Sequence, residues 1–165
     1  GGETHPPGIM PEGLDPWNAE GRGEPHKRGV SFTHVVDSTG LCQFVVGTYP
    51  HASVLVEFLN AITGWNVDMD EVLTIGERIS NIRQAFNIRE GINPLEYHVP
   101  GRVLGRPPQE VGPLAGVSVD EETLDRDYLT AMDWDLATAK PGKRKLQELG
   151  MEDVAELLWP ARPEG

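Results

Sequence analysis

The residues best suited to chemistry lie in one short stretch, Asp37-Ser38-Thr39-Gly40-Leu41-Cys42, which contains the only cysteine of the chain. A cysteine thiolate is a soft metal ligand, and a carboxylate accepts paired hydrogen bonds from a planar group. Gly40 has no Cβ, so it would let a ligand approach the backbone closely. The stretch therefore predicts a tight turn that offers a thiolate and a carboxylate together. The same residues also fit an Asx-type turn beside a small buried cysteine.

Further short motifs follow Asp37-x-x-Gly40-Leu41-Cys42 along the chain. They are Thr63-Gly64, Gly76-Glu77-Arg78-Ile79, Ile82-Arg83-Gln84-Ala85-Phe86-Asn87-Ile88-Arg89-Glu90-Gly91, Pro100-Gly101-Arg102, Tyr128 with Trp134-Asp135, and Leu146-x-x-Leu149-Gly150. In this order they resemble the tungsten-dependent aldehyde ferredoxin oxidoreductase family, from about Val35 to Met151. One departure is Met132-Asp133, where the family usually has Arg-Gly. This departure bears on substrate class if the pair shapes a substrate channel.

The resemblance implies that the chain is the C-terminal part of such an enzyme. It implies that Cys42 is the last cysteine ligand of a 4Fe-4S cluster, and that Asp37 accepts hydrogen bonds from the amino–amidine edge of a molybdopterin-type ligand. Backbone groups of Gly40 and Leu41 would lie against the same ring. The implied cofactors are therefore a tungsten-bis-molybdopterin and the cluster. The implied reaction oxidises an aldehyde to a carboxylic acid, with ferredoxin as electron acceptor and the N-terminal domains of the same enzyme as a further partner.

Two stretches in the middle of the chain have the period and the capping residues of helices. A helix at about 51–63 is predicted by apolar residues three and four apart, with Gly64 at its end. A longer helix at about 69–90 is predicted to begin after Asp68, which forms a capping pattern with Glu71, and to stop at Gly91. We expect its buried stripe to consist of Val72, Ile75, Ile79, Ile82 and Phe86.

The C-terminal part predicts a third helix at about 119–132, capped by Ser118 with Glu121, and two short helices at 143–149 and 151–158. Much of the rest is loop, because the 165 residues include 19 glycines and 14 prolines. The loop segments expected are 1–29 and the irregular connection 93–116, with an extended stretch at 30–36.

The predicted fold class is mainly α, an irregular helical domain with long Gly/Pro-rich loops. We expect three parts along the chain: residues 1–34 as a loop-rich segment belonging to a larger enzyme, 35–158 as the helical C-terminal domain, and 159–165 as a loose tail. At 165 residues the chain is long enough for one hydrophobic core.

The formal net charge of −12 argues against nucleic acid and anionic membrane as partners. No apolar run approaches the length of a membrane span. A single cysteine excludes an internal disulfide and fits a reducing compartment, so we expect the protein in the cytoplasm.

Several alternatives stay open from the sequence. His5, His26 and His34 invite a zinc interpretation, but their spacing fits no ligand pattern. Cys42 as a nucleophile would need a paired base, and His34 is close only in sequence. A non-catalytic helical interaction module, lacking the cofactor sites, is the alternative function. The charged residues of the 69–90 helix favour an ion-paired surface, with contact to a cofactor phosphate as the alternative; they are Arg78, Arg83, Arg89 and Glu90.

Overall fold

The computed structural model describes residues 5–15 and 17–160. All regular elements in these residues are helical, and the only β pairings there are two isolated bridges. The elements are α1 (Gly23–Thr39), α2 (Gln43–Val46), α3 (Ser53–Thr63), α4 (Met69–Arg89), the 3-10 helix η1 (Pro94–Glu96), α5 (Glu121–Ala131), α6 (Lys143–Glu148) and α7 (Glu152–Leu158). The predicted mainly α class is therefore confirmed.

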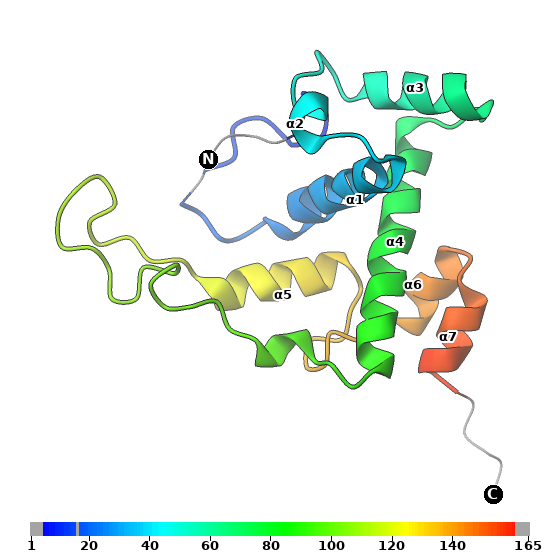
Figure 1. Ribbon diagram of the computed structural model, residues 1–165. Helices are drawn as coiled ribbons and strands as arrows, with labels where there is room; N and C mark the ends of the chain where they lie inside the picture. Colours follow the sequence, from blue (N-terminus) through cyan, green and yellow to red (C-terminus); the bar gives the residue numbers. More distant parts are fainter. Residues whose placement is uncertain (1–4, 16, 161–165) are drawn as a thin grey trace, which may run out of the picture.

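Helix α4 is the central element of the arrangement (Figure 1). Helices α1 and α3 pack against its N-terminal half, α5 packs against α1, and α6 and α7 lie on the other side of α4. The first core cluster joins the N-terminal loop to α1–α4 and consists of Ile9, Phe32, Val35, Val36, Val46, Ala52, Leu55 and Val72. The second joins the C-terminal half of α4 to α6 and α7 and consists of Ala85, Leu146, Leu149, Met151, Val154, Ala155 and Leu158.

The backbones of α1 and α4 approach each other closely where Gly76 faces Ser31. A Cβ added at Gly76 would overlap the carbonyl group of Ser31. Only glycine allows this approach, because any side chain would have to occupy the space of the neighbouring backbone. This contact sets the distance between α1 and α4. It therefore also sets the position of the C-terminal end of α1.

The ends of the predicted helices at 51–63 and 69–90 are confirmed. Gly64 and Gly91 both have positive φ angles, 75° and 76°, as expected of glycines that end helices. The Asp68 side chain accepts a hydrogen bond of 2.9 Å from the backbone N–H of Glu71. The connection 93–116 is irregular as predicted, apart from η1. The two short C-terminal helices are present as α6 and α7.

The expectation of loop holds for the described residues before Gly23, but it is wrong for 23–29, and the extended chain over 30–36 is also wrong, because α1 begins at Gly23 and continues to Thr39. Pro25 is tolerated in the first turn of the helix. Burial of Phe32, Val35 and Val36 on one face of α1 outweighs the β preference of the valines. Helix α1 also runs without a break across position 34, where the sequence placed a domain boundary.

The stripe expected to be buried on α4 is wrong in its second half, since Ile82 is 52% exposed and Phe86 is 53% exposed. The buried face of α4 instead carries mostly small and polar residues, namely Val72, Gly76, Ser80, Asn81, Gln84 and Ala85. Close packing against α1 requires small side chains there, so the second half of the apolar stripe, Ile82 and Phe86, is left uncovered by the described residues.

Two smaller expectations are also corrected. Helix α5 is capped by Asp120, which accepts from the N–H of Thr123 at 3.1 Å, rather than by Ser118 with Glu121. The tail is anchored at Trp159, whose indole Nε1 donates to the Pro141 carbonyl at 2.9 Å. The remainder of the expected tail, 161–165, lies outside the described residues.

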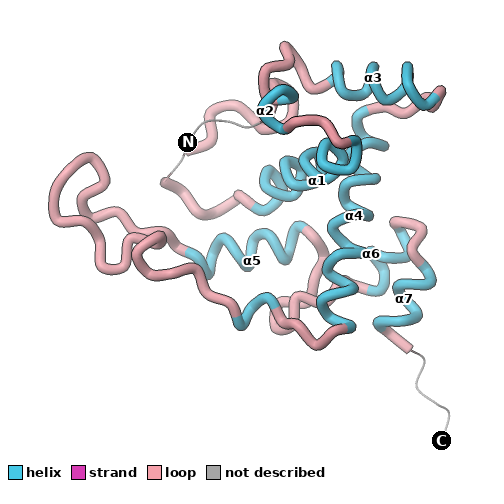
Figure 2. The backbone as a smooth tube through the Cα atoms, viewed as in Figure 1, coloured by secondary structure: helices cyan, strands magenta, loops and turns pink. Residues whose placement is uncertain are grey.

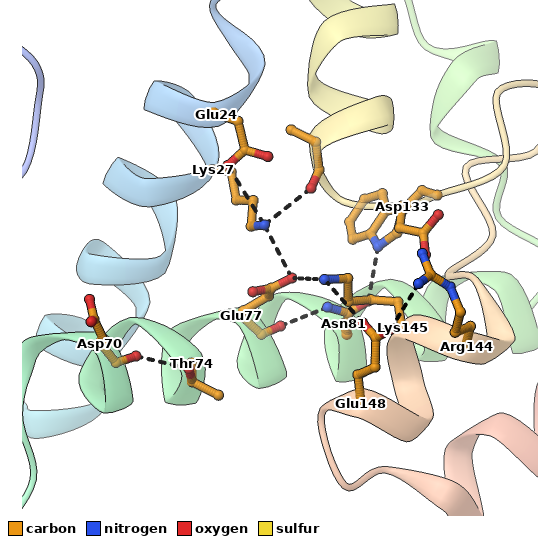
Figure 3. Close-up of polar contacts among 12 residues, drawn as sticks. Glu24, Lys27, Asp70, Thr74, Glu77, Asn81, Asp133, Arg144, Lys145 and Glu148 are labelled. Atoms are coloured by element: carbon orange, nitrogen blue, oxygen red, sulfur yellow. Dashed lines mark hydrogen bonds and ion pairs between the residues drawn. The ribbon is translucent and has the colours of Figure 1, made fainter.

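A shielded cluster of charges ties three helices together (Figure 3). Glu77 on α4 lies 3.5 Å from the Nζ of Lys27 on α1 and 3.4 Å from the Nζ of Lys145 on α6. The three side chains are 13%, 18% and 20% exposed, so water screens their charges only weakly. Within the described residues the Glu77 Oε1 atom makes no hydrogen bond, so the two ammonium groups alone balance its charge.

We expect Glu77→Gln to lower the free energy of unfolding by about 3 kcal/mol, because it removes the carboxylate that two shielded ammonium groups share and leaves them only the more exposed Glu24 and Glu148 as partners. Urea denaturation of the chain measures this. Glu24→Gln is the matched control: Glu24 lies 3.8 Å from the same Lys27, but its side chain is 73% exposed. The control should lose no more than about 0.5 kcal/mol. Equal losses for both variants would contradict the importance of the cluster.

We expect Gly76→Ala to destabilise the fold by about 3 kcal/mol, because the added methyl group overlaps the backbone of α1. Gly64→Ala provides the comparison, since a Cβ there meets open space and carries only the cost of a left-handed residue, about 1 kcal/mol. Thermal unfolding followed by circular dichroism ranks the two variants. A smaller loss at Gly76 than at Gly64 would show that the two helices can separate at little cost.

Candidate functional site

The predicted chemical stretch consists of the last turn of α1 and the short connection to α2 (Figure 2). Asp37 lies in the last turn of α1, and Gly40 ends this helix in the left-handed conformation with φ 74°. The Gly40 N–H donates to the Asp37 carbonyl at 3.3 Å. Glycine is required here by the backbone, and a Cβ at this position would meet open space. The predicted tight turn is therefore present, and its surface at Gly40 is open.

Cys42 is the N-cap residue of α2 and is exposed. Its carbonyl accepts hydrogen bonds from the N–H groups of Val45 at 3.0 Å and Val46 at 3.1 Å, while its side chain is exposed. Val46 is fully buried and fixes the short helix to the first core cluster. The interpretation of Cys42 as a small buried hydrophobe is therefore wrong, and its thiol is available to a ligand.

Asp37 and Leu41 have different positions in the turn. The Asp37 carboxylate is exposed, and it forms no hydrogen bond or ion pair with any residue that the structure describes. The Leu41 side chain is half-buried against the first core cluster, and its N–H donates to the Thr39 hydroxyl at 3.4 Å. The turn thus presents two reactive side chains, Asp37 and Cys42, from a segment that is anchored on its inner side by Leu41.

His34 lies one helical turn before Asp37 and contacts α4. The Arg83 guanidinium donates a hydrogen bond of 3.0 Å to Nδ1 of His34. Partial burial of the ring lowers the pKa of His34 from its ordinary value, the Arg83 charge lowers it further, and Asp37 opposes both effects. No base among the described residues hydrogen-bonds to Cys42, and His34 is engaged by Arg83. The arrangement therefore does not support Cys42 as a nucleophile.

The other charged residues on α4 serve the fold. The Arg78 Nε donates to the Leu149 carbonyl at 2.6 Å. Arg89 pairs with Glu90 at 2.7 Å, and its guanidinium carbon lies 5.0 Å from the centroid of the Phe86 ring. The expected ion-paired surface is confirmed for Arg89 and Glu90, and Arg83 is the arginine of this group that contacts His34 on α1.

His5 and His26, which the zinc interpretation grouped with His34, also make contacts within the fold. His5 Nε2 lies 3.1 Å from both the Gly29 carbonyl and the Thr33 hydroxyl. The ring of His26 packs edge-on against Tyr128 at 4.9 Å between centroids, and burial lowers its pKa. Residues 5–15 and 17–160 contain no group of three or more His, Cys, Asp or Glu side chains placed to hold a metal ion. His5 and His26 are therefore engaged in contacts within the fold.

The tryptophan–aspartate motif near the end of α5 holds an irregular segment in place. The Trp134 indole Nε1 donates to the buried Asn81 at 2.9 Å. The Asp135 carboxylate accepts from the Thr138 hydroxyl and from two backbone N–H groups, and the Thr138 hydrogen bond is the largest cause of its lowered pKa. Tyr128 lines a separate pocket of about 480 Å³ together with Trp17 and His26.

Large apolar side chains are exposed beside the turn and along α3 and α4. Phe44 on α2 is 82% exposed and Ile62 on α3 is 83% exposed. The others in these regions are Val45, Phe58, Trp65, Ile82 and Phe86. Exposed apolar surface of this extent is typical of a face that another protein segment covers. In the described part of the chain, none of the helices has the length and apolar character needed to cross a membrane.

Comparison with known proteins gives one consistent result. Residues 2–151 match the family model for aldehyde ferredoxin oxidoreductase, domains 2 and 3. The tungsten-containing aldehyde ferredoxin oxidoreductases of Pyrococcus horikoshii and Pyrococcus abyssi are 37% and 35% identical over 122 residues, 73% of this chain. The protein of the same name from Thermococcus kodakarensis is 33% identical over 125 residues, 75% of this chain. The chain spans 20% of the length of each of these relatives.

We expect Cys42 to react with a thiol reagent in the folded chain, because its side chain is exposed at the start of α2. A maleimide added without denaturant should label one thiol per chain, as measured by mass spectrometry. The extent and rate should match those of the same chain in denaturant within about tenfold, because accessibility no longer limits the reaction. Labelling that requires denaturant would contradict the exposed position of the thiol.

Proposed function

The chain belongs to the aldehyde ferredoxin oxidoreductase family, and on this premise we propose that it supplies one cluster cysteine and one pterin contact to a tungsten-dependent enzyme. That enzyme would oxidise aldehydes to carboxylic acids and pass the electrons to ferredoxin. The observation that carries this proposal is the turn between α1 and α2, which presents the Asp37 carboxylate and the Cys42 thiol on an open surface. Both groups are accessible and both have free coordination or hydrogen-bonding capacity, so the residues present fit the two cofactors.

Cys42 is proposed as the metal ligand of this part of the enzyme. Iron–sulfur clusters are typically held by four cysteine thiolates, and this chain has one cysteine. The remaining ligands would therefore come from other parts of the enzyme. The fixed start of α2 would hold the Cys42 sulfur in place, because Val46 anchors that helix in the core.

Asp37 is proposed as the pterin contact. A carboxylate has only acceptor atoms, and it can take two parallel hydrogen bonds from adjacent N–H groups of a planar edge. Asp37 has this capacity available in the described structure. Backbone groups at Gly40 and Leu41 are proposed to lie against the same ring, and the open space at Gly40 permits that approach.

The roles of the protein residues in the reaction are those of binding and orientation. The bound tungstopterin and cluster supply the two-electron oxidation of the aldehyde and the onward transfer of electrons. Asp37 would hold the edge of the pterin, and Cys42 would hold one corner of the cluster. Because both belong to one turn, the chain would place the two groups next to each other.

The exposed apolar surface of α2, α3 and α4 supports a further part of the proposal. We propose that the N-terminal domains of the same enzyme cover it, since the relatives are five times as long as the matched region. The net charge of −12 argues against nucleic acid as a partner. The single reduced cysteine fits the cytoplasm as the proposed location.

The deciding test is Cys42→Ser in the full-length enzyme. Serine is close to cysteine in volume but is a poorer ligand for iron, so the electron paramagnetic resonance signal of the reduced cluster should shift or disappear. Electron transfer to ferredoxin should fall more than the tungsten content, because the Asp37 contact remains. Ser38→Ala is the control, since Ser38 is exposed in the same segment and its hydroxyl only donates to the His34 carbonyl. A Cys42→Ser enzyme with an unchanged cluster signal would exclude the proposed ligand role.

A further inference from the structure

The contact between Arg83 and His34 fixes the position of a proton. A guanidinium group has donors only, so the His34 Nδ1 atom, 3.0 Å from Arg83 Nη1, must accept and cannot carry hydrogen. A neutral imidazole with an unprotonated Nδ1 carries its hydrogen on Nε2. The contact therefore makes the far nitrogen of His34 a hydrogen-bond donor.

The surroundings of His34 keep the ring neutral. Partial burial is the largest cause of its lowered pKa, the Arg83 charge from α4 acts in the same direction, and only Asp37 on α1 opposes them. With its pKa below the ordinary value, His34 is mainly uncharged at pH 7. A neutral donor is therefore available three residues before the Asp37 acceptor.

We propose that His34 and Asp37 form one two-part recognition site, in which the His34 Nε2–H donates to a ring carbonyl while the Asp37 carboxylate accepts from the adjacent N–H groups. Residues three apart on a helix lie on the same face, so the two side chains can contact one planar ligand. This inference rests on the proposed function and specifies the ligand edge: an amino group, a ring N–H and a carbonyl in a row, as in a pterin.

The chemistry of that edge explains why a second residue is needed. A carboxylate pairs with the amino and ring N–H groups but cannot pair with the neighbouring carbonyl, because it has no hydrogen to donate. A buried carbonyl without a donor weakens binding. His34 supplies the donor on the same face of α1, and the pair distinguishes a 4-oxo ring edge from an edge with a second amino group there.

Arg83 acts in this site as a positioning residue, since it touches His34 and sets which nitrogen carries the hydrogen. Arg78 is engaged by the Leu149 carbonyl and Arg89 by Glu90, so neither can replace it. Arg83 belongs to the motif at 82–91, and its contact with His34 links this motif to the end of α1 that carries Asp37. The two sequence motifs thus meet in one site, although His34 and Arg83 are 49 residues apart.

The first test uses the full-length enzyme and measures how much pterin each variant retains after dialysis, from the fluorescence of the released and oxidised pterin. A glutamine amide places an N–H near the position of imidazole Nε2, whereas an asparagine amide places one near Nδ1. We therefore expect His34→Gln to retain pterin as the unmodified enzyme does. His34→Asn should lose pterin about twofold to tenfold more readily, since it removes one hydrogen bond.

Asp37→Ala in the same assay separates this inference from the proposed function. Loss of pterin in Asp37→Ala with no loss in His34→Asn would overturn the role of His34 and leave the proposed function standing. No loss in either variant would overturn both the Asp37 contact and this inference. Equal losses in His34→Gln and His34→Asn would also overturn the inference, because the effect would then not depend on the position of the donor.

The second test observes the tautomer directly by nitrogen NMR of the full-length enzyme labelled at histidine. We expect the His34 hydrogen on Nε2 and a ring that remains neutral at a pH where an ordinary histidine is half protonated. Arg83→Leu should raise the pKa of His34 and allow both tautomers. Arg89→Leu, on the same helix, should leave His34 unchanged. A hydrogen on Nδ1 in the unmodified enzyme would overturn the inference.

Discussion

The close contact between the backbones of α1 and α4 at Gly76 is the constraint on which the other features depend. It allows α1 to lie so near α4 that Arg83 can reach His34 and Glu77 can reach Lys27. A side chain at position 76 would push α1 outward and lengthen both contacts. The position of the α1–α2 turn therefore follows from the absence of one Cβ atom on α4, at Gly76, where it faces Ser31 of α1.

The polar interior of α4 is a consequence of that packing. Gln84 donates to the Ala139 carbonyl at 3.0 Å, and Asn81 accepts from Trp134. Buried polar groups are tolerated when they are paired, and here the pairing holds the irregular segment after α5. The face of α4 that carries Ile82 and Phe86 stays exposed among the described residues. Helix α4 thus joins parts of its own domain through paired polar side chains as well as through Val72 and Ala85, while Ile82 and Phe86 remain exposed.

The sequence was sufficient for most of the helices and for the turn, because these depend on local signals. Gly64, Asp68 and Gly91 act on the backbone beside them, so their roles are visible in a linear pattern. Helix α1 was missed because its valines become helical only through burial against α4. The buried face of α4 was misjudged because an apolar period does not say which surface is present to cover it. The contact of His34 with Arg83 has no local signal, since the fold alone brings these residues together.

The turn between α1 and α2 also limits how far Asp37 and Cys42 can separate. Five residues of chain span at most about 18 Å even when fully extended, and Asp37 and Cys42 are joined by a folded segment that is shorter than this. Movement of α1 relative to the rest of the enzyme would carry both side chains in the same direction. A pterin and a cluster held by this turn would keep a constant separation while the surrounding domains move. If the turn holds both groups as proposed, the length of this segment rather than the arrangement of neighbouring domains would set the distance between them.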